Sequence, residues 1–301
     1  MSVAERILCL LPDENDDTGD LRAEKQRGVA MKIMQFGMPT LIEIETLESC
    51  AVLCRELGLS FIEINMNLPQ FQANKLNVQQ LMEIAQKYNI YYTIHLDENL
   101  NPCDFNGKVA TAYNETVLET IEIAKHLSVS ILNMHLSAGV YFTLPNKKVF
   151  LFDEYETEYL KKLVAFRDIS TRAIGDSSLR ICIENCGGYV PFQVKSLDLL
   201  LKSPVFMLTF DIGHNASAGF ADEPLILERA DKLCHMHIHD VVPNKKDHIT
   251  LGKGELDLMK YLNLAKERDC RAVIEVKTVA GLRDSVEWLR GNINGIKNQR
   301  I

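Results

Sequence analysis

The sequence contains no long apolar run and no tract rich in lysine or arginine. No stretch approaches the roughly 18 apolar residues that cross a membrane, and the first thirty residues lack a cationic start followed by an apolar segment. Basic residues are the minority, at 33 against 41 acidic residues, which gives a net charge of -8 and a pI of about 5.6. We therefore expect a cytoplasmic protein that does not bind membranes and for which nucleic acid is the less favoured partner.

Cysteine motifs that hold metals or form disulfide frameworks are also missing. The eight cysteines include pairs four residues apart, such as Cys50 and Cys54, but no CxxC sequence. The chain is far larger than disulfide-dense secreted domains, so reduced and mostly buried thiols are expected. A metal site in this protein has to use other residue types.

From Met31 onward, short β-rich runs alternate with longer helical patterns. Eight strand-then-helix units in about 270 residues are typical of a closed parallel barrel, because open doubly wound sheets normally have five or six strands. The pattern predicts an α/β protein, a (β/α)8 TIM barrel that forms a single domain over residues 31–301. The predicted strands span residues 32–37, 60–65, 90–96, 130–135, 179–184, 205–211, 233–239 and 271–276. The predicted helices span residues 47–57, 78–87, 108–127, 153–173, 196–201, 224–230, 256–267 and 282–288.

Residues 1–30 do not fit this alternation. They carry a mixed-charge sequence with one short apolar patch, which predicts a frayed N-terminal extension. Alternatively, translation starts at Met31. The sequence alone does not separate these two interpretations, and it does not indicate whether the barrel forms a homo-oligomer.

Histidine and carboxylate residues stand at the ends of the last six predicted strands, where barrel enzymes place their active sites. Strand side chains alternate between two faces, so His235, His237 and His239 of the HMHIHD sequence share one face. Charged groups inside a barrel cost several kcal/mol unless they are paired or bound to a metal. Imidazole and carboxylate without thiolate predict a divalent ion, Zn²⁺ or Mn²⁺, with Co²⁺, Fe²⁺ and Mg²⁺ as alternatives. The strand-end residues are His95, His135, Glu184, Asp211 with His214, His237 and Glu275.

The sequences IENCGG, FDIGHNASAG, HMHIHD, DHITLGKGELD and VIEVKT, in this order and spacing, resemble the xylose isomerase-like TIM barrel superfamily. This superfamily includes sugar phosphate isomerases and epimerases, and abasic-site nucleases of the endonuclease IV type. The resemblance covers the chain from Met31 to Trp288.

The resemblance implies a ligand set. In the ketose epimerase branch one divalent ion is held by four residues, which match Glu184, Asp211, His237 and Glu275. In the endonuclease branch further ligands hold a three-zinc cluster, and the matching residues, which would face the substrate in an epimerase, are His95, His135, His214 and His248. That branch has an aspartate two residues before the last of these histidines, but Lys246 stands there, so the three-zinc set is incomplete.

The first hypothesis for function is a divalent-metal-dependent isomerase or epimerase that acts on a ketose-like sugar or sugar phosphate through an enediolate. By resemblance, Glu184 and Glu275 would serve as paired acid and base while also binding the metal. The second hypothesis is zinc-dependent hydrolysis of abasic DNA, against which stand the acidic sequence LDENLNPCD after His95 and the lack of a basic loop beside the first two strands. The third is a metal-containing binding barrel without catalytic activity.

Several of these residues also have simpler explanations. Glu184 and Glu275 could form structural ion pairs with Arg180 or Lys277, and Asp211 could cap a following turn. The LGKG sequence lacks the spacing of a phosphate-binding Walker motif, and a tight turn explains it equally well. It follows the seventh strand, where barrels often bind phosphate, so Lys253 is a further candidate for binding the substrate.

Overall fold

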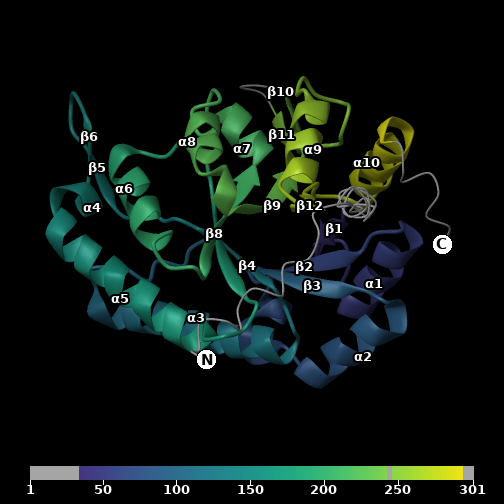
Figure 1. Cartoon of the computed structure of the whole chain (residues 1–301), viewed down its shortest axis with the longest axis horizontal. Coiled ribbons are helices and arrows are strands. Elements are labelled where there is room, and N and C mark those ends of the chain that lie inside the picture. Colours follow the sequence, from purple (N-terminus) through teal and green to yellow (C-terminus); the bar gives the residue numbers. More distant parts are fainter. Residues whose placement is uncertain (1–33, 243–245, 294–301) are drawn as a thin grey trace, which may run out of the picture. The chain divides into compact units, whose positions relative to one another are not determined.

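The computed structural model describes residues 34–242 and 246–293, and in this part of the chain eight parallel strands form a closed barrel (Figure 1). Around the barrel the strands follow the order β1, β12, β9, β8, β7, β4, β3, β2, and β2 pairs with β1 to close it. The barrel strands are β1 (Phe36–Pro39), β2 (Phe61–Asn65), β3 (Tyr91–His95), β4 (Ile131–His135), β7 (Arg180–Glu184), β8 (Phe206–Asp211), β9 (Leu233–Ile238) and β12 (Arg271–Ile274).

Helices connect the strands and cover the outside of the barrel (Figure 1). Several of them start at a polar residue whose side chain accepts a main-chain N–H of the first turn, as Thr46, Asn77 and Asp257 do. Within the described residues, no helix is both long and apolar enough to span a membrane. The helices are α1 (Leu47–Glu56), α2 (Val78–Tyr88), α3 (Gly107–His126), α4 (Leu151–Glu154), α5 (Glu156–Ile174), α6 (Pro191–Leu200), α7 (Ile212–Ser217), α8 (Glu223–Glu228), α9 (Leu258–Glu267) and α10 (Val279–Asn292), with 3-10 turns η4 (Pro69–Phe71), η5 (Ala73–Lys75) and η6 (Ala230–Lys232).

The alternation of side chains along each strand determines what lies inside the barrel. In β2, Ile62 and Ile64 belong to the apolar core shared with the helices, whereas Glu63 between them reaches a histidine of β9 on the other side of the interior. The register of the parallel pairs places His135 beside Glu184, and Asp211 beside His237. Polar residues from different strands therefore end at the same level of the barrel.

The predicted fold class is confirmed, with differences at element boundaries. The first strand starts at Phe36, and both residues 31–33 and the predicted extension 1–30 lie outside the described residues. Helix α6 starts at Pro191 instead of residue 196, because proline is well suited to the first helical position and the Gln193 side chain accepts the N–H of Val190. The prediction missed α7 and two hairpins in strand-to-helix loops, which are β5 (Tyr141–Thr143) with β6 (Lys148–Phe150) and β10 (Asp240–Val242) with β11 (Lys246–Ile249).

The described cysteines are all free thiols, as expected. Five of the seven are buried, Cys234 is partly exposed and Cys186 is exposed. Burial raises the pKa of Cys50 to about 11 and that of Cys103 to about 12, so these two thiols stay protonated and unreactive near neutral pH.

Candidate metal centre

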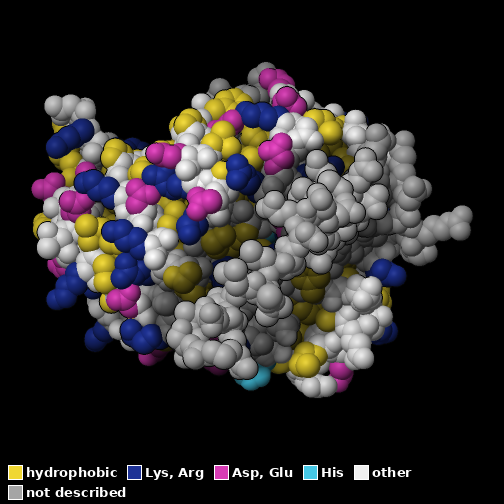
Figure 2. Space-filling view, in the orientation of Figure 1, with side chains coloured by type: hydrophobic (Ala, Val, Ile, Leu, Met, Phe, Trp, Pro, Cys, Tyr) yellow, Lys and Arg dark blue, Asp and Glu magenta, His cyan; other side chains and the backbone are white. Residues whose placement is uncertain are grey.

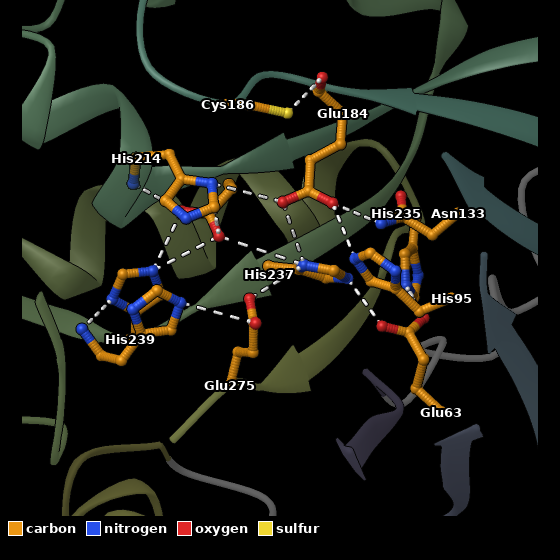
Figure 3. Close-up of polar contacts among 12 residues, drawn as sticks. Glu63, His95, Asn133, Glu184, Cys186, His214, His235, His237, His239 and Glu275 are labelled. Atoms are coloured by element: carbon orange, nitrogen blue, oxygen red, sulfur yellow. Dashed lines mark hydrogen bonds and ion pairs between the residues drawn. The ribbon is translucent and has the colours of Figure 1, made fainter. Parts of the chain in front are cut away.

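The carboxyl ends of β7, β8, β9 and β12 bring the four predicted metal ligands together. Nδ1 of His237 lies 3.0 Å from Oε2 of Glu275 and 3.4 Å from Oε1 of Glu184 (Figure 3). Oδ2 of Asp211 lies 4.0 Å from the same nitrogen. All four side chains belong to residues that are at most 8% exposed, so the group is almost completely removed from solvent.

The polar atoms in this group fit a cation. Oε1 of Glu184, Nδ1 of His237 and Oε2 of Glu275 are buried and have no hydrogen-bond partner among the described residues. Buried polar atoms are almost always paired, so three such atoms facing one another indicate a missing common partner. Four ligands at about 2.1 Å from a tetrahedral ion lie about 3.4 Å apart, close to the separations here. The oxygen and nitrogen donors suit Zn²⁺, Mn²⁺, Co²⁺ and Fe²⁺ alike.

The charges in the centre are strongly coupled. Burial by itself would raise the pKa of Glu184, but the charge of His237 and contacts with His135 and His214 outweigh it and hold this pKa well below its usual range. Burial would likewise raise the pKa of Glu275, and His237 again outweighs it and lowers the value. The pKa of His237 is raised because Glu184, Glu63 and Glu275 outweigh the effect of its burial. Without a metal, a charged histidine therefore compensates for carboxylates that an ion would otherwise neutralise.

His95 of β3 and His135 of β4 lie beside Oε2 of Glu184. His95 donates from Nδ1 to the carbonyl of Leu96 at 2.7 Å, which leaves its Nε2 facing Oε2 of Glu184 at 3.4 Å. Nε2 of His135 lies 3.3 Å from the same oxygen, and the Asn133 amide donates to it. Burial lowers the pKa of His95, but the contact with Glu184 reverses this effect and raises the pKa to about 9.

The other two predicted histidines lie on the opposite side of the centre. The main-chain N–H of His214 donates to Oδ1 of Asp211 at 2.7 Å, so Asp211 does cap α7. Its Oδ2, which Nε2 of His239 also approaches at 3.3 Å, faces Nδ1 of His237. Nδ1 of His214 lies 3.4 Å from Oε1 of Glu184. His248 lies in β11 with a positive φ of 49°, and its Nε2 is 3.5 Å from Oε1 of Glu275. Both rings are partly buried and border the centre.

Of the ion pairs considered as alternatives to metal binding, the described residues include the one between Lys277 and Glu275 but none with Arg180. Nζ of Lys277 lies 2.8 Å from Oε1 of Glu275, so one oxygen of this carboxylate is engaged and the other faces the centre. The Arg180 guanidinium instead donates to the carbonyls of Ser177 and Leu179. An ion pair with Arg180 therefore does not account for the position of Glu184, whose described ion-pair partners are histidines.

The LGKG loop is organised around a buried aspartate that the sequence analysis did not single out. Oδ2 of Asp240 accepts the main-chain N–H groups of Gly252 at 2.9 Å and Gly254 at 2.8 Å. Its Oδ1 accepts the N–H of Leu256 at 3.1 Å. These amides are the donors that a phosphate would use, and they already bind a carboxylate. Lys253 itself is exposed, and its assignment as a substrate-binding residue stays a prediction.

The main residue that the sequence analysis missed is Glu63, in the interior of the barrel below the centre. Its Oε1 lies 2.8 Å from Nε2 of His237, and its Oε2 accepts from Nε2 of His235 at 2.9 Å (Figure 3). The hydroxyl of Thr93 also donates to Oε2 at 2.9 Å. Burial alone would raise the pKa of Glu63, but the two histidines hold it well below its usual range. With one nitrogen of His237 facing Glu63, the other is directed into the centre. In the sequence, Glu63 could have been recognised as a charged residue between two isoleucines of a predicted barrel strand.

A cavity of about 390 Å³ opens beside Glu184 and His135. Glu98, Ser137 and Tyr189 contribute to its wall, and the described residues of the wall include neither lysine nor arginine. The volume is within the range of small-molecule sites, and the polar lining suits a ligand rich in hydroxyl groups. Glu184 belongs both to the four candidate ligands and to the cavity wall, so the cavity adjoins this group at the carboxyl end of the barrel.

Comparisons with known proteins agree with this architecture. Over 266 residues the chain is 24% identical to the uncharacterized protein MJ1311 of Methanocaldococcus jannaschii, covering 84% of this chain and 86% of MJ1311. Among solved structures, a D-tagatose 3-epimerase-like protein has a TM-score of 0.68 at 24% identity and covers 86% of this chain and 96% of its own. The 3-keto-D-glucoside 4-epimerase YcjR of E. coli has a TM-score of 0.66 at 15% identity, with 86% and 100% covered. The family model described as xylose isomerase-like TIM barrel matches residues 51–292, and the chain belongs to this family.

Proposed function

We propose that the protein is a divalent-metal-dependent isomerase or epimerase that acts on a ketose-like sugar through an enediolate. The observation that carries this proposal is the set of buried, unpartnered atoms of Glu184, His237 and Glu275, which face one another beside a cavity. Sugar epimerases are among the solved structures with the same fold, which supports the reaction class.

The positions of the two glutamates support a role in proton exchange. Each directs one oxygen into the centre and the other away from it, toward His95 and His135 for Glu184 and toward Lys277 for Glu275. They come from β7 and β12, which are separated by two strands, so they approach a bound sugar from different sides. Each would exchange a proton with a substrate carbon, one as base and the other as acid. A bound divalent ion would supply the stabilisation of the enediolate charge.

The four histidines around the centre and the cavity would bind substrate hydroxyl groups. Among the described residues that line the cavity are Glu98 and Glu184 but no lysine or arginine, which favours a sugar without a phosphate group over a sugar phosphate. Engagement of the LGKG amides by Asp240 supports the same choice. Lys253 would bind substrate only if a sugar phosphate extended to that loop.

The test is hydrogen exchange and product formation on a panel of free ketoses and their phosphates, with Mn²⁺ or Zn²⁺ added. Glu275→Gln should keep the fold and abolish solvent deuterium incorporation at the reacting carbon, because the amide neither accepts nor donates the proton. Glu267→Gln, at an exposed position of α9, is the matched control and should retain activity. Turnover by Glu275→Gln at the level of the control would refute the role of Glu275.

One observation favours the second candidate function, phosphodiester hydrolysis at abasic sites. Further groups of potential ligands lie beside Glu184, Asp211, His237 and Glu275. One includes His95 and shares Glu184, and another includes His214, His239 and His248 and shares Asp211, as expected where several ions lie side by side. The described part of the face in Figure 2 shows basic and acidic side chains intermingled rather than a continuous basic area, which gives DNA little support there.

The number of bound ions separates these candidates. About one ion per chain after purification without added metal supports the epimerase, and two or three zinc ions support the nuclease. Chelator-sensitive nicking of a duplex with an abasic site would establish the second function. Bound metal without turnover in either assay would instead indicate a binding barrel.

A further inference from the structure

His239 directly follows β9 and lies against the centre without being one of its four ligands. It is fully buried, and its Nε2 lies 3.1 Å from Oδ1 and 3.3 Å from Oδ2 of Asp211 (Figure 3). Proximity alone would make it a fifth ligand or a ligand of a neighbouring ion, since Asp211, His214 and His248 are close enough to share an ion with it.

The second ring nitrogen decides between these roles. Nδ1 of His239 accepts the main-chain N–H of His248 at 2.8 Å. A neutral imidazole has one donor and one acceptor nitrogen, so an Nδ1 that accepts requires the proton on Nε2. Nε2 then donates to Asp211. In this tautomer neither nitrogen has a lone pair free for a metal, because one is used by the main chain and the other is protonated.

The surroundings of the ring hold it in this orientation. A Cβ atom at Gly213 would lie 1.9 Å from Cε1 of His239, so only glycine leaves room for the imidazole there. The ring of His248 stacks on that of His239, with centroids 4.0 Å apart and planes inclined by 6°. The imidazole is therefore held by Gly213, by the His248 ring and by contacts at both nitrogens.

The same contacts determine the orientation of Asp211. Its main-chain N–H and C=O are both bound by the Asn185 side chain at 2.9 Å, so only side-chain rotation remains free. Oδ1 accepts from the main chain of His214, and the ring of His239 contacts both carboxylate oxygens, with Oδ1 the nearer; Oδ2 lies 4.0 Å from Nδ1 of His237. Donors to a ligating carboxylate fix its direction, and losing one typically costs about 10–100-fold in metal affinity.

We propose that His239 is a positioning residue that orients Asp211 toward the metal, and that the main-chain N–H of His248 selects the tautomer that does so. The proposal rests on the metal centre above and adds a link from β11 to one of its ligands. It assigns different roles to the three inward histidines of HMHIHD, with His237 as a ligand, His239 bound to Asp211 and His235 bound to Glu63.

Two substitutions at this position distinguish positioning from ligation. The amide of His239→Gln offers one acceptor for the His248 N–H and one donor for Asp211, whereas His239→Leu offers neither. Zn²⁺ and Mn²⁺ dissociation constants, measured by competition with a chelator, should rise by about 10–100-fold in His239→Leu. The value for His239→Gln should stay nearer to that of the unaltered protein. His126→Gln, on the exposed surface of α3, is the matched control and should leave both constants unchanged.

Equal losses of affinity in the Gln and Leu variants, or a reduced number of bound ions in either, would overturn the positioning role. ¹⁵N spectra of the unaltered protein give an independent readout if His239→Leu fails to fold. We expect His239 with a protonated Nε2 and an unprotonated Nδ1, both without metal and with Zn²⁺. Loss of the Nε2 proton on addition of Zn²⁺ would identify a ligand and refute the proposal. Failure of the unaltered protein to bind either metal would refute the metal centre together with this role.

Discussion

Replacing Glu63 with leucine should destabilise the metal-free protein strongly. Glu63 is 1% exposed and faces His235, His237 and the Thr93 hydroxyl. Leucine fills similar space but leaves these buried polar groups without an acceptor. Removing one partner of a buried ion pair costs about 3–5 kcal/mol, in contrast to replacing all partners by apolar residues, which is often neutral.

This cost corresponds to a measurable change in melting temperature. An unfolding entropy of about 2.1 cal/mol/K per residue gives about 0.6 kcal/mol/K for the 301-residue chain, so Tm should fall by about 5–8 °C. Because the two histidines lower the pKa of Glu63, its contribution is present above the ordinary glutamate pKa of about 4.3 and is lost as the pH falls below that value. The difference between variant and unaltered protein should therefore be large at neutral pH and shrink in acid.

Calorimetry in the presence of a chelator measures this difference without a contribution from bound metal. Glu119→Leu, the same substitution at an exposed position of α3, is the control and should change stability by no more than about 0.5 kcal/mol. A Tm for the Glu63 variant equal to or above that of the control would show that the histidines find other partners. It would also refute the argument that Glu63 directs His237 into the centre.

Three further predictions concern other parts of the site and the barrel. Zn²⁺ at about 100 times its dissociation constant should stabilise the protein by about 2.7 kcal/mol and raise Tm by about 4 °C. In calorimetry, Glu184→Gln should show a much smaller rise in Tm on addition of Zn²⁺, and an equal rise would contradict ligation by Glu184. A hydrogen bond from a neighbouring thiol and nearby arginines lower the pKa of Cys234, whereas burial raises that of Cys103 to about 12, so iodoacetamide followed by peptide mapping should find Cys234 modified before Cys103. Modification of Cys103 before Cys234 would be inconsistent with these environments. Asp240→Asn replaces one acceptor oxygen by an amide group and should accelerate hydrogen exchange of the main-chain N–H of Gly254. Unchanged protection of this N–H would show that the carboxylate does not organise the LGKG loop.

The barrel and the convergence of Glu184, Asp211, His237 and Glu275 could be predicted because both depend on local patterns. Strands covered by helices have apolar residues on their outer face, and Ile62 and Ile64 display this pattern directly. Glu184, Asp211 and His237 each stand at or near the end of such a run, and parallel strand ends meet at one edge of the barrel. Their convergence therefore follows from the topology before any distance is known.

The residues that support the ligands could not be assigned in this way. Glu63 and His235 are 172 positions apart and lie on strands that are not neighbours, so their contact depends on the stagger and closure of the whole barrel. The role of His239 depends on where the main chain of His248 lies, and this is set by a hairpin with a positive φ. Helix α7 has only six residues, too few for a periodic pattern.

The pairing of β1 with β12 has a consequence for biosynthesis. The first strand stays unpaired on one side until β12 has been synthesised, since among the described residues no earlier strand occupies that edge. Glu275 directly follows β12, so a nascent chain that lacks this segment has neither a closed sheet nor the complete set of candidate ligands. Closure of the barrel and assembly of the candidate metal centre should thus occur together, once this segment has been made.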